Sequence, residues 1–160
     1  KPMSNIKADI NLNQDIFTAL IARHEVQRQL CQQLENTDDS KEQAKIYQQF
    51  KLELTAHAAA EERHLYVPVM EHDDGLDIAR HAITEHHEMD ELIDTLDNHQ
   101  PDSDKWQQAL KDLIHKVRHH LDEEEEEFFK QSKDILADDL QQRLGSLYQV
   151  EHNEFIENNK

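Results

Sequence analysis

The sequence has few of the residues that interrupt helices or cross-link chains. Its 160 residues include two glycines, three prolines and one cysteine. Because Gln, Glu, Leu, Ala and Lys are abundant while glycine and proline are scarce, we predict an all-α protein. The single cysteine, Cys31, excludes an intrachain disulfide framework and fits a reducing compartment, so we expect a cytoplasmic protein.

Long apolar runs and an excess of positive charge are also missing. The longest apolar run, residues 65–70, is far shorter than the roughly 20 residues of a membrane-spanning helix. The chain carries 35 acidic and 17 basic residues, a formal net charge of -18. Nucleic acids and anionic membranes need a basic face on their partner, so this balance argues against both and favours cations.

Apolar residues recur every three or four positions and predict four long helices, over about residues 12–34, 40–68, 76–96 and 104–130. Ser40 and Gln43 form a capping-box pattern at the second start, and Pro68 is expected to kink or end that helix. A shorter helix over 135–144 is expected to stop at Gly145.

This organisation predicts a single domain over residues 1–160. Four long helices joined by short loops are typical of an antiparallel up-down-up-down four-helix bundle, here over about residues 12–131. A C-terminal helical tail is expected over about residues 132–160.

Two predicted helical hairpins repeat one pattern. Each has a lone histidine on its first helix, and a His-x-x-x-Glu motif followed by an apolar pair on its second. Residues four apart share a helix face. The separation from the lone histidine to the second is 33 residues in one copy and 34 in the other. The members are His24, His57, Glu61 and Leu65–Tyr66 in the first hairpin, and His86, His120, Glu124 and Phe128–Phe129 in the second.

These six histidines and glutamates fall on the apolar stripes of the predicted helices. A buried carboxylate is unfavourable by several kcal/mol unless a positive group meets it. Arg28, one turn beyond His24, is the only internal basic residue to weigh against a metal. Four imidazoles and two carboxylates suit iron, manganese or zinc, and exceed the four ligands of a structural zinc site. We therefore predict two metal ions bridged by the carboxylates.

The motif set resembles the hemerythrin family, specifically its hemerythrin-like HHE cation-binding branch. The resemblance covers about residues 12–131 and rests on the lone-histidine helices, the HAAAEERHLYVP stretch at 57–68, Glu85–His86 and His120–Glu124. It implies a non-haem centre of two iron ions with an oxo or hydroxo bridge, which binds or senses dioxygen, nitric oxide or peroxide. A protein partner is possible. The implied bridging ligands are Glu61 and Glu124, and the implied terminal ligands are His24, His57, His86 and His120.

The sequence departs from the five-histidine pattern of the oxygen-carrying hemerythrins. Their third helix supplies two histidines four residues apart, but Ala82 stands four residues before His86. One iron would then be more open to exogenous molecules, which disfavours reversible oxygen carriage and favours sensing, redox chemistry or metal handling. The sequence leaves open whether an extra ligand comes from His81, His87, His119 or Asp90.

Other functions stay open at this level. An iron-storage or iron-responsive protein would bind metal without dioxygen chemistry, a di-iron peroxidase or oxidase would be an enzyme, and a metal-free acidic bundle would be an interaction module. A ferritin-like oxidase needs two Glu-x-x-His motifs, and only Glu61 with His64 fits. We therefore favour a binding or sensing protein over an enzyme. Surface positions are expected for His64, His72, His99, His115 and His152.

Overall fold

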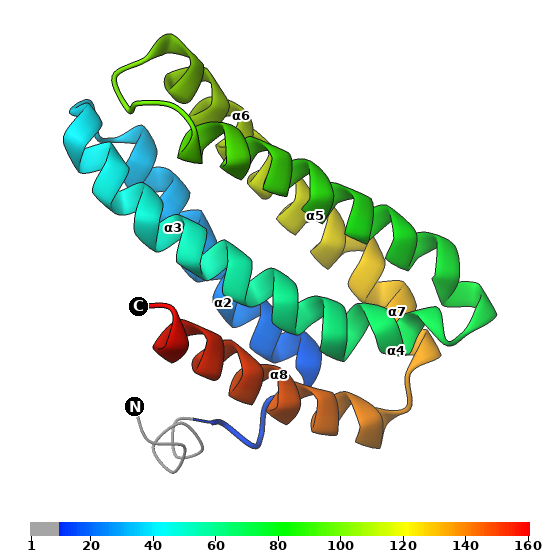
Figure 1. Cartoon of the computed structure of the whole chain (residues 1–160). Coiled ribbons are helices and arrows are strands. Elements are labelled where there is room, and N and C mark those ends of the chain that lie inside the picture. The colour runs from blue at the N-terminus through cyan, green and yellow to red at the C-terminus, as the bar shows by residue number, and fades with distance from the viewer. Residues whose placement is uncertain (1–9) are drawn as a thin grey trace.

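The computed structural model describes residues 10–160, and this part of the chain is helical with no strand. The first nine residues of the predicted domain lie outside it. Figure 1 shows an elongated bundle in which successive long helices run antiparallel, with a further helix along one side. The predicted all-α bundle with a C-terminal helix is confirmed. The long helices are α2 (Ile16–Glu35), α3 (Ser40–Glu61), α5 (Leu76–Asp97), α6 (Asp104–Glu123) and α8 (Asp138–Asn158).

Polar side chains cap the starts of three bundle helices. The cap of α3 is Asp39 rather than the predicted Ser40, because the Asp39 carboxylate accepts a hydrogen bond from the backbone N–H of Glu42 at 3.1 Å. Similar caps at Asp15 and Ser103 start α2 and α6. They satisfy backbone N–H groups that the first helical turn leaves without a partner. Because of its cap, α2 begins later than the predicted start near residue 12.

The second helix of each hairpin contains a π turn at or just after the glutamate of its His-x-x-x-Glu motif. In an α-helix, residues five positions apart lie on different faces, whereas the i to i+5 bonding of a π turn brings them one above the other. Tyr66 thereby reaches Glu61, five residues earlier. Beyond its π turn, the first of these helices ends two residues after Pro68. The π turns and the helices that follow them are η1 (Glu62–Tyr66), α4 (Val67–Met70), η3 (Glu124–Phe128) and α7 (Phe129–Ile135), and η2 (Asp73–Gly75) leads into α5.

The C-terminal helix is longer than predicted, because α8 continues through Gly145 instead of stopping there. A Cβ atom at position 145 would lie 2.3 Å from the carbonyl oxygen of Gln14 and 2.6 Å from the carbonyl carbon of Asp15. Gly145 therefore allows α8 to approach the start of α2 closely, and it does not end the helix.

The continuation of α8 changes the environment of two side chains. Tyr148, which lies beyond the predicted end of this helix, is buried. The prediction that His152 lies at the surface is wrong, since its Nε2 lies 2.9 Å from a carboxylate oxygen of the buried Glu53. Arg23 pairs with the same carboxylate. This buried polar group fixes α8 on the α2–α3 hairpin.

The bundle core consists of two apolar clusters. One contains Phe17, Leu65 and Phe129, and the other contains Phe50 and Trp106. On α2, α3 and α5, one histidine of the repeat lies between residues of the two clusters, and on α6 His120 lies at the end of the second cluster, before Phe128 of the first. The repeat therefore forms a buried polar layer between two apolar ones. Among the described residues, no helix is long and apolar enough to cross a membrane.

The lone cysteine belongs to the second apolar cluster. Cys31 is fully buried, and this burial raises the pKa of its thiol to about 12. A thiol of this kind packs as a small apolar residue.

Candidate metal centre

The polar layer receives side chains from all four bundle helices. Two lone histidines come from α2 and α5, two more come from α3 and α6, and the glutamates stand at the end of α3 and the start of η3. None is more than 5% exposed. The structure thus brings together all six residues that the sequence predicted as ligands: His24, His57, Glu61, His86, His120 and Glu124.

Glu61 faces one histidine from each hairpin. Its Oε1 lies 3.3 Å from Nε2 of His57 and 3.3 Å from Nε2 of His86. Its Oε2 and the Nε2 of His57 are buried without a hydrogen-bond partner in the described structure. Such atoms are rare in folded proteins, and an ion is one of the partners that explains them.

Glu124 also faces both hairpins. Its Oε1 lies 3.3 Å from Nε2 of His24, and its Oε2 lies 3.4 Å from Nε2 of His120. The Glu124 Oε1 and both Nε2 atoms are buried without a hydrogen-bond partner among the described residues. Two overlapping sets of donor atoms result, each within 4.8 Å, and they are His24, His57, Glu61 and Glu124, and Glu61, His86 and His120.

The outer nitrogen, Nδ1, of each of these histidines contacts a side chain from another element. Hydrogen bonds at Nδ1 fix the ring orientation and leave Nε2 directed at the centre of the cluster, as second partners do in metal sites. Three of the four partners are carboxylates, which also increase the basicity of the ring. The pairs are His24 with Glu125 at 2.7 Å, His86 with Glu62 at 3.1 Å, His120 with Glu85 at 2.8 Å and His57 with Tyr148 at 2.6 Å.

These Nδ1 partners were not predicted from the sequence. A signal existed for Glu62 and Glu125, which directly follow the two glutamates of the repeat and each support the lone histidine of the other hairpin. Glu85 precedes His86 but supports a different histidine. Nothing in the sequence indicated Tyr148, because the helix that carries it was predicted to stop at Gly145.

Tyr66 joins the cluster from η1. Its hydroxyl donates a hydrogen bond to Glu61 Oε1 at 2.9 Å, contacts Glu124 Oε2, and lies 3.3 Å from Nε2 of His86. Burial and the two carboxylates raise the pKa of Tyr66 well above its usual value, so the hydroxyl keeps its proton. The corresponding residue of the second hairpin is Phe129, which stacks on His24 with ring centroids 5.7 Å apart.

The electrostatics of the cluster favour positive charge. Burial lowers the pKa of each histidine, but nearby carboxylates outweigh it and raise the pKa of His24 and His86 to about 9 and that of His120 to about 10. His57 is the exception, since burial holds its pKa below the usual value. Without a metal, protons on imidazoles balance the carboxylates, and metal ions bound here would displace those protons.

The residues considered as extra ligands lie outside this cluster. The side chains of His81 and His119 are each 59% exposed and lie near Glu123, and His87 is exposed beside Glu91. Asp90 is exposed at the edge of a small cavity whose walls include three of the cluster histidines.

Arg28 and His64, which the sequence offered as alternatives to the predicted metal ligands, contact other residues. Arg28 pairs with Glu25, Asp122 and Glu125, and has no ion pair with either central glutamate among residues 10–160. It therefore supports the partner of His24 rather than replacing a metal. His64, part of the ferritin-like pattern, contacts Glu151 at 2.9 Å instead of entering the cluster.

A pocket opens on one side of the cluster. It has a volume of about 190 Å³ and lies between α5, α6 and η3, with His120 and Glu124 in its wall. Ile78, Ala82 and Phe128 supply apolar surface. The opposite side of the cluster is covered by α8 through Tyr148. A small molecule therefore has access from the α5–α6 side.

Comparison with known proteins agrees with this geometry. Curated protein sequences and solved structures gave no significant match. The family profile described as "Hemerythrin HHE cation binding domain" matches residues 15–132, a segment that includes all six cluster residues. A chain of this family, with a buried His/Glu cluster, has the features of a cation-binding protein. The chain belongs to the hemerythrin HHE cation-binding domain family.

Proposed function

We propose that the protein binds two iron ions at the His/Glu cluster and that this centre binds or senses a small molecule such as dioxygen, nitric oxide or peroxide. The observation that carries the proposal is the set of buried ring nitrogens and carboxylate oxygens that converge without hydrogen-bond partners. Imidazole and carboxylate donors suit iron, and the donor set is large enough for two ions.

The residues divide between two ions in a simple way. Glu61 belongs to both donor sets and would be shared, and Glu124 would form a second bridge because its two oxygens face histidines of different hairpins. His24 and His57 would complete one ion, and His86 with His120 would complete the other.

The surrounding side chains would prepare the cluster for its metals. Carboxylates at Nδ1 hold His24, His86 and His120 in place, and the Tyr66 hydroxyl donates to Glu61 and contacts Glu124. When bound, an iron pair supplies electron transfer and a coordination position for an exogenous ligand. The pocket beside His120 and Glu124 gives such a ligand a route in from the α5–α6 side.

The experiment is to measure metal content and the ultraviolet–visible spectrum of protein purified in air from iron-supplemented cells. We expect about two irons per chain, as in other carboxylate-bridged bundle centres, with visible bands that bleach with dithionite and return in air. Iron without a spectral response to reduction would indicate storage instead. Colourless protein that stays folded and takes up no ferrous iron anaerobically would contradict the proposal.

Variants connect the metal to the cluster. His57→Ala and Glu124→Ala should each lose metal and lower the melting temperature of the metal-loaded protein, because each removes a ligand. His72→Ala, at an exposed position, is the matched control and should keep both properties. Unchanged metal content and melting in both cluster variants would refute the ligand assignment.

A further inference from the structure

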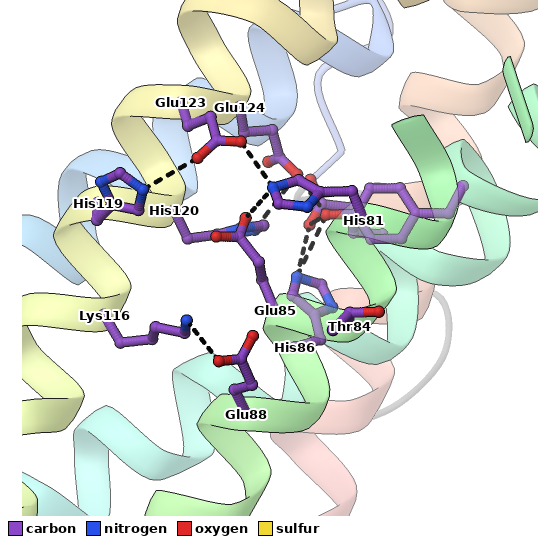
Figure 2. A network of polar contacts seen from close by, with 12 residues as sticks. His81, Thr84, Glu85, His86, Glu88, Lys116, His119, His120, Glu123 and Glu124 are labelled. Atoms are coloured by element: carbon purple, nitrogen blue, oxygen red, sulfur yellow. Dashed lines mark hydrogen bonds and ion pairs between the residues drawn. The ribbon is translucent and has the colours of Figure 1, made fainter. Parts of the chain in front are cut away.

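A second group of metal-ligand side chains lies outside the buried cluster, where the pocket meets the surface of α5 and α6. Figure 2 shows His81, Glu85, Glu123 and His119 directed toward one another from these two helices. His81 Nε2 lies 2.7 Å from Glu123 Oε1 and 3.7 Å from Glu85 Oε1. The other oxygen of Glu123 lies 3.0 Å from His119 Nε2.

This outer group has the geometry of a cation site. Donor atoms of His81, Glu85 and Glu123 all lie within 4.8 Å of one another. Among residues 10–160, no lysine or arginine lies within ion-pair distance of either carboxylate, and the neighbouring Lys116 pairs with Glu88 at 2.8 Å. The carboxylates therefore face histidine rings rather than lysine or arginine side chains.

The internal repeat shows that these residue types are confined to one hairpin. The positions of the α2–α3 hairpin that correspond to the outer group carry three alanines and one arginine, and α8 packs over that hairpin. Four ligand-type side chains thus lie on the hairpin that α8 leaves uncovered, with His81 and His119 exposed and Glu85 buried beneath them. The corresponding pairs are His81 and Ala19, Glu85 and Arg23, His119 and Ala56, and Glu123 and Ala60.

The outer group is continuous with a polar path into the bundle. Glu85 Oε1, which faces His81, also accepts the hydrogen bond from His120 Nδ1 at 2.8 Å. The pocket wall contains His81, Glu85 and Glu123 together with His120 and Glu124 of the buried cluster. A cation in this pocket would meet only ligand-type polar groups along one side.

We propose that His81, Glu85 and Glu123 form a second, outer site for one divalent transition-metal ion, and that His119, which contacts Glu123 at 3.0 Å, joins them as a fourth ligand. Two imidazoles and two carboxylates without a thiolate are donors that Zn²⁺, Fe²⁺ and Co²⁺ accept. The site goes beyond the proposed function of the buried centre, because none of its four residues is a ligand of that centre.

The test is a Co²⁺ titration of the full-length protein as purified, followed by calorimetry and by the visible bands of Co²⁺. The double variant His81→Ala/His119→Ala should bind about one ion fewer than the parent chain, or bind it at least about tenfold more weakly, because half of the ligands are gone. The control is His72→Ala/His87→Ala, which removes two exposed histidines outside the group and should bind as the parent does.

The result is the difference in Co²⁺ binding between the parent and the double variant. Both chains keep the buried cluster, so its occupancy affects them equally. Both histidines are largely exposed and touch no ligand of the buried cluster, so the double variant should melt like the parent in the absence of metal. Equal Co²⁺ stoichiometry and affinity in the parent and the double variant would overturn the proposal. Loss of binding in the control pair as well would also overturn it.

Discussion

The two hairpins of the bundle carry the same repeat in different surroundings. The C-terminal helix α8 packs on α2 and α3, on the opposite side of the bundle from α5 and α6 (Figure 1). In the covered hairpin, His57 meets the hydroxyl of Tyr148, whereas in the open hairpin its counterpart His120 meets the carboxylate of Glu85. The same His-x-x-x-Glu motif therefore lies in two electrostatically different halves.

The difference is visible in the two histidines themselves. Burial keeps the pKa of His57 below its usual value, while Glu124 and Glu85 outweigh burial at His120 and raise its pKa to about 10. The open half also carries the pocket and the outer group of ligand-type residues. The half covered by α8 thus contains the neutral His57, whereas the accessible half contains the protonated His120.

Displacing α8 from the α2–α3 hairpin should have the largest effect on stability. Gly145→Leu should lower the free energy of unfolding by about 3 kcal/mol, because any Cβ at this position meets the backbone of Gln14 and Asp15. Chemical denaturation followed by circular dichroism measures the change. Arg143→Leu, at an exposed position of the same helix, is the control. Equal stability of the two variants would show that α8 does not need this close approach.

The charge difference can be tested by pH in chelator-treated, metal-free protein. The folded pKa of His120 is raised from 6.5 to about 10, so its contribution to stability is complete below pH 6.5 and is lost as the pH rises through about 10. We expect a lower melting temperature at pH 10 than at pH 7. Imidazole resonances should show His57 neutral at pH 7 and His120 protonated. A His57 that keeps its proton to a higher pH than His120 would contradict the comparison.

The Nδ1 partners should contribute unequally to metal affinity. Glu85→Gln should weaken metal binding by the buried centre by about 10- to 100-fold, the range for second partners of ligating histidines. Tyr148→Phe should have a smaller effect, because a neutral hydroxyl adds less basicity to the ring than a carboxylate. Competition with a chelator measures both. Glu88→Gln, on the same helix as Glu85, is the control. A larger loss of metal affinity for Tyr148→Phe than for Glu85→Gln would contradict this ranking of the two partners.

The smallest effect is expected where a tyrosine in one half corresponds to a phenylalanine in the other. Tyr66→Phe makes the halves alike and removes a donor from two buried carboxylates, so metal-free protein should lose about 1–2 kcal/mol of stability. Tyr47→Phe is the control, because its acceptor Asp97 is partly exposed and water can replace the bond. Urea denaturation measures the free energy of unfolding of both variants. Equal losses would show that the Tyr66 hydroxyl contributes no more to stability than the Tyr47 hydroxyl.

The helical repeat made much of the centre predictable. His24, His57, Glu61, His86, His120 and Glu124 were identified by their spacing on apolar stripes, and the structure places all six in one buried layer. Spacing along a helix is a local property, and helical periodicity fixes which residues share a face. The π turns were not foreseen, although both follow the same motif.

The errors fell where a contact joins distant segments. Gly145 has the local signature of a helix end, but its packing against Gln14 is an interaction across the chain. His152 was predicted at the surface because nothing in its neighbourhood indicates Glu53, 99 residues away. Local propensity does not carry such information, because tertiary packing overrides it.

The sequence by itself therefore determined the helical bundle and the six residues of its polar layer, since both follow from periodic patterns within single helices. The tertiary structure alone decided which side chain supports each histidine, which hairpin α8 covers and where the pocket opens. Those properties depend on contacts between residues as far apart as His24 and Glu125, or His57 and Tyr148. Only the packing of whole helices sets such distances.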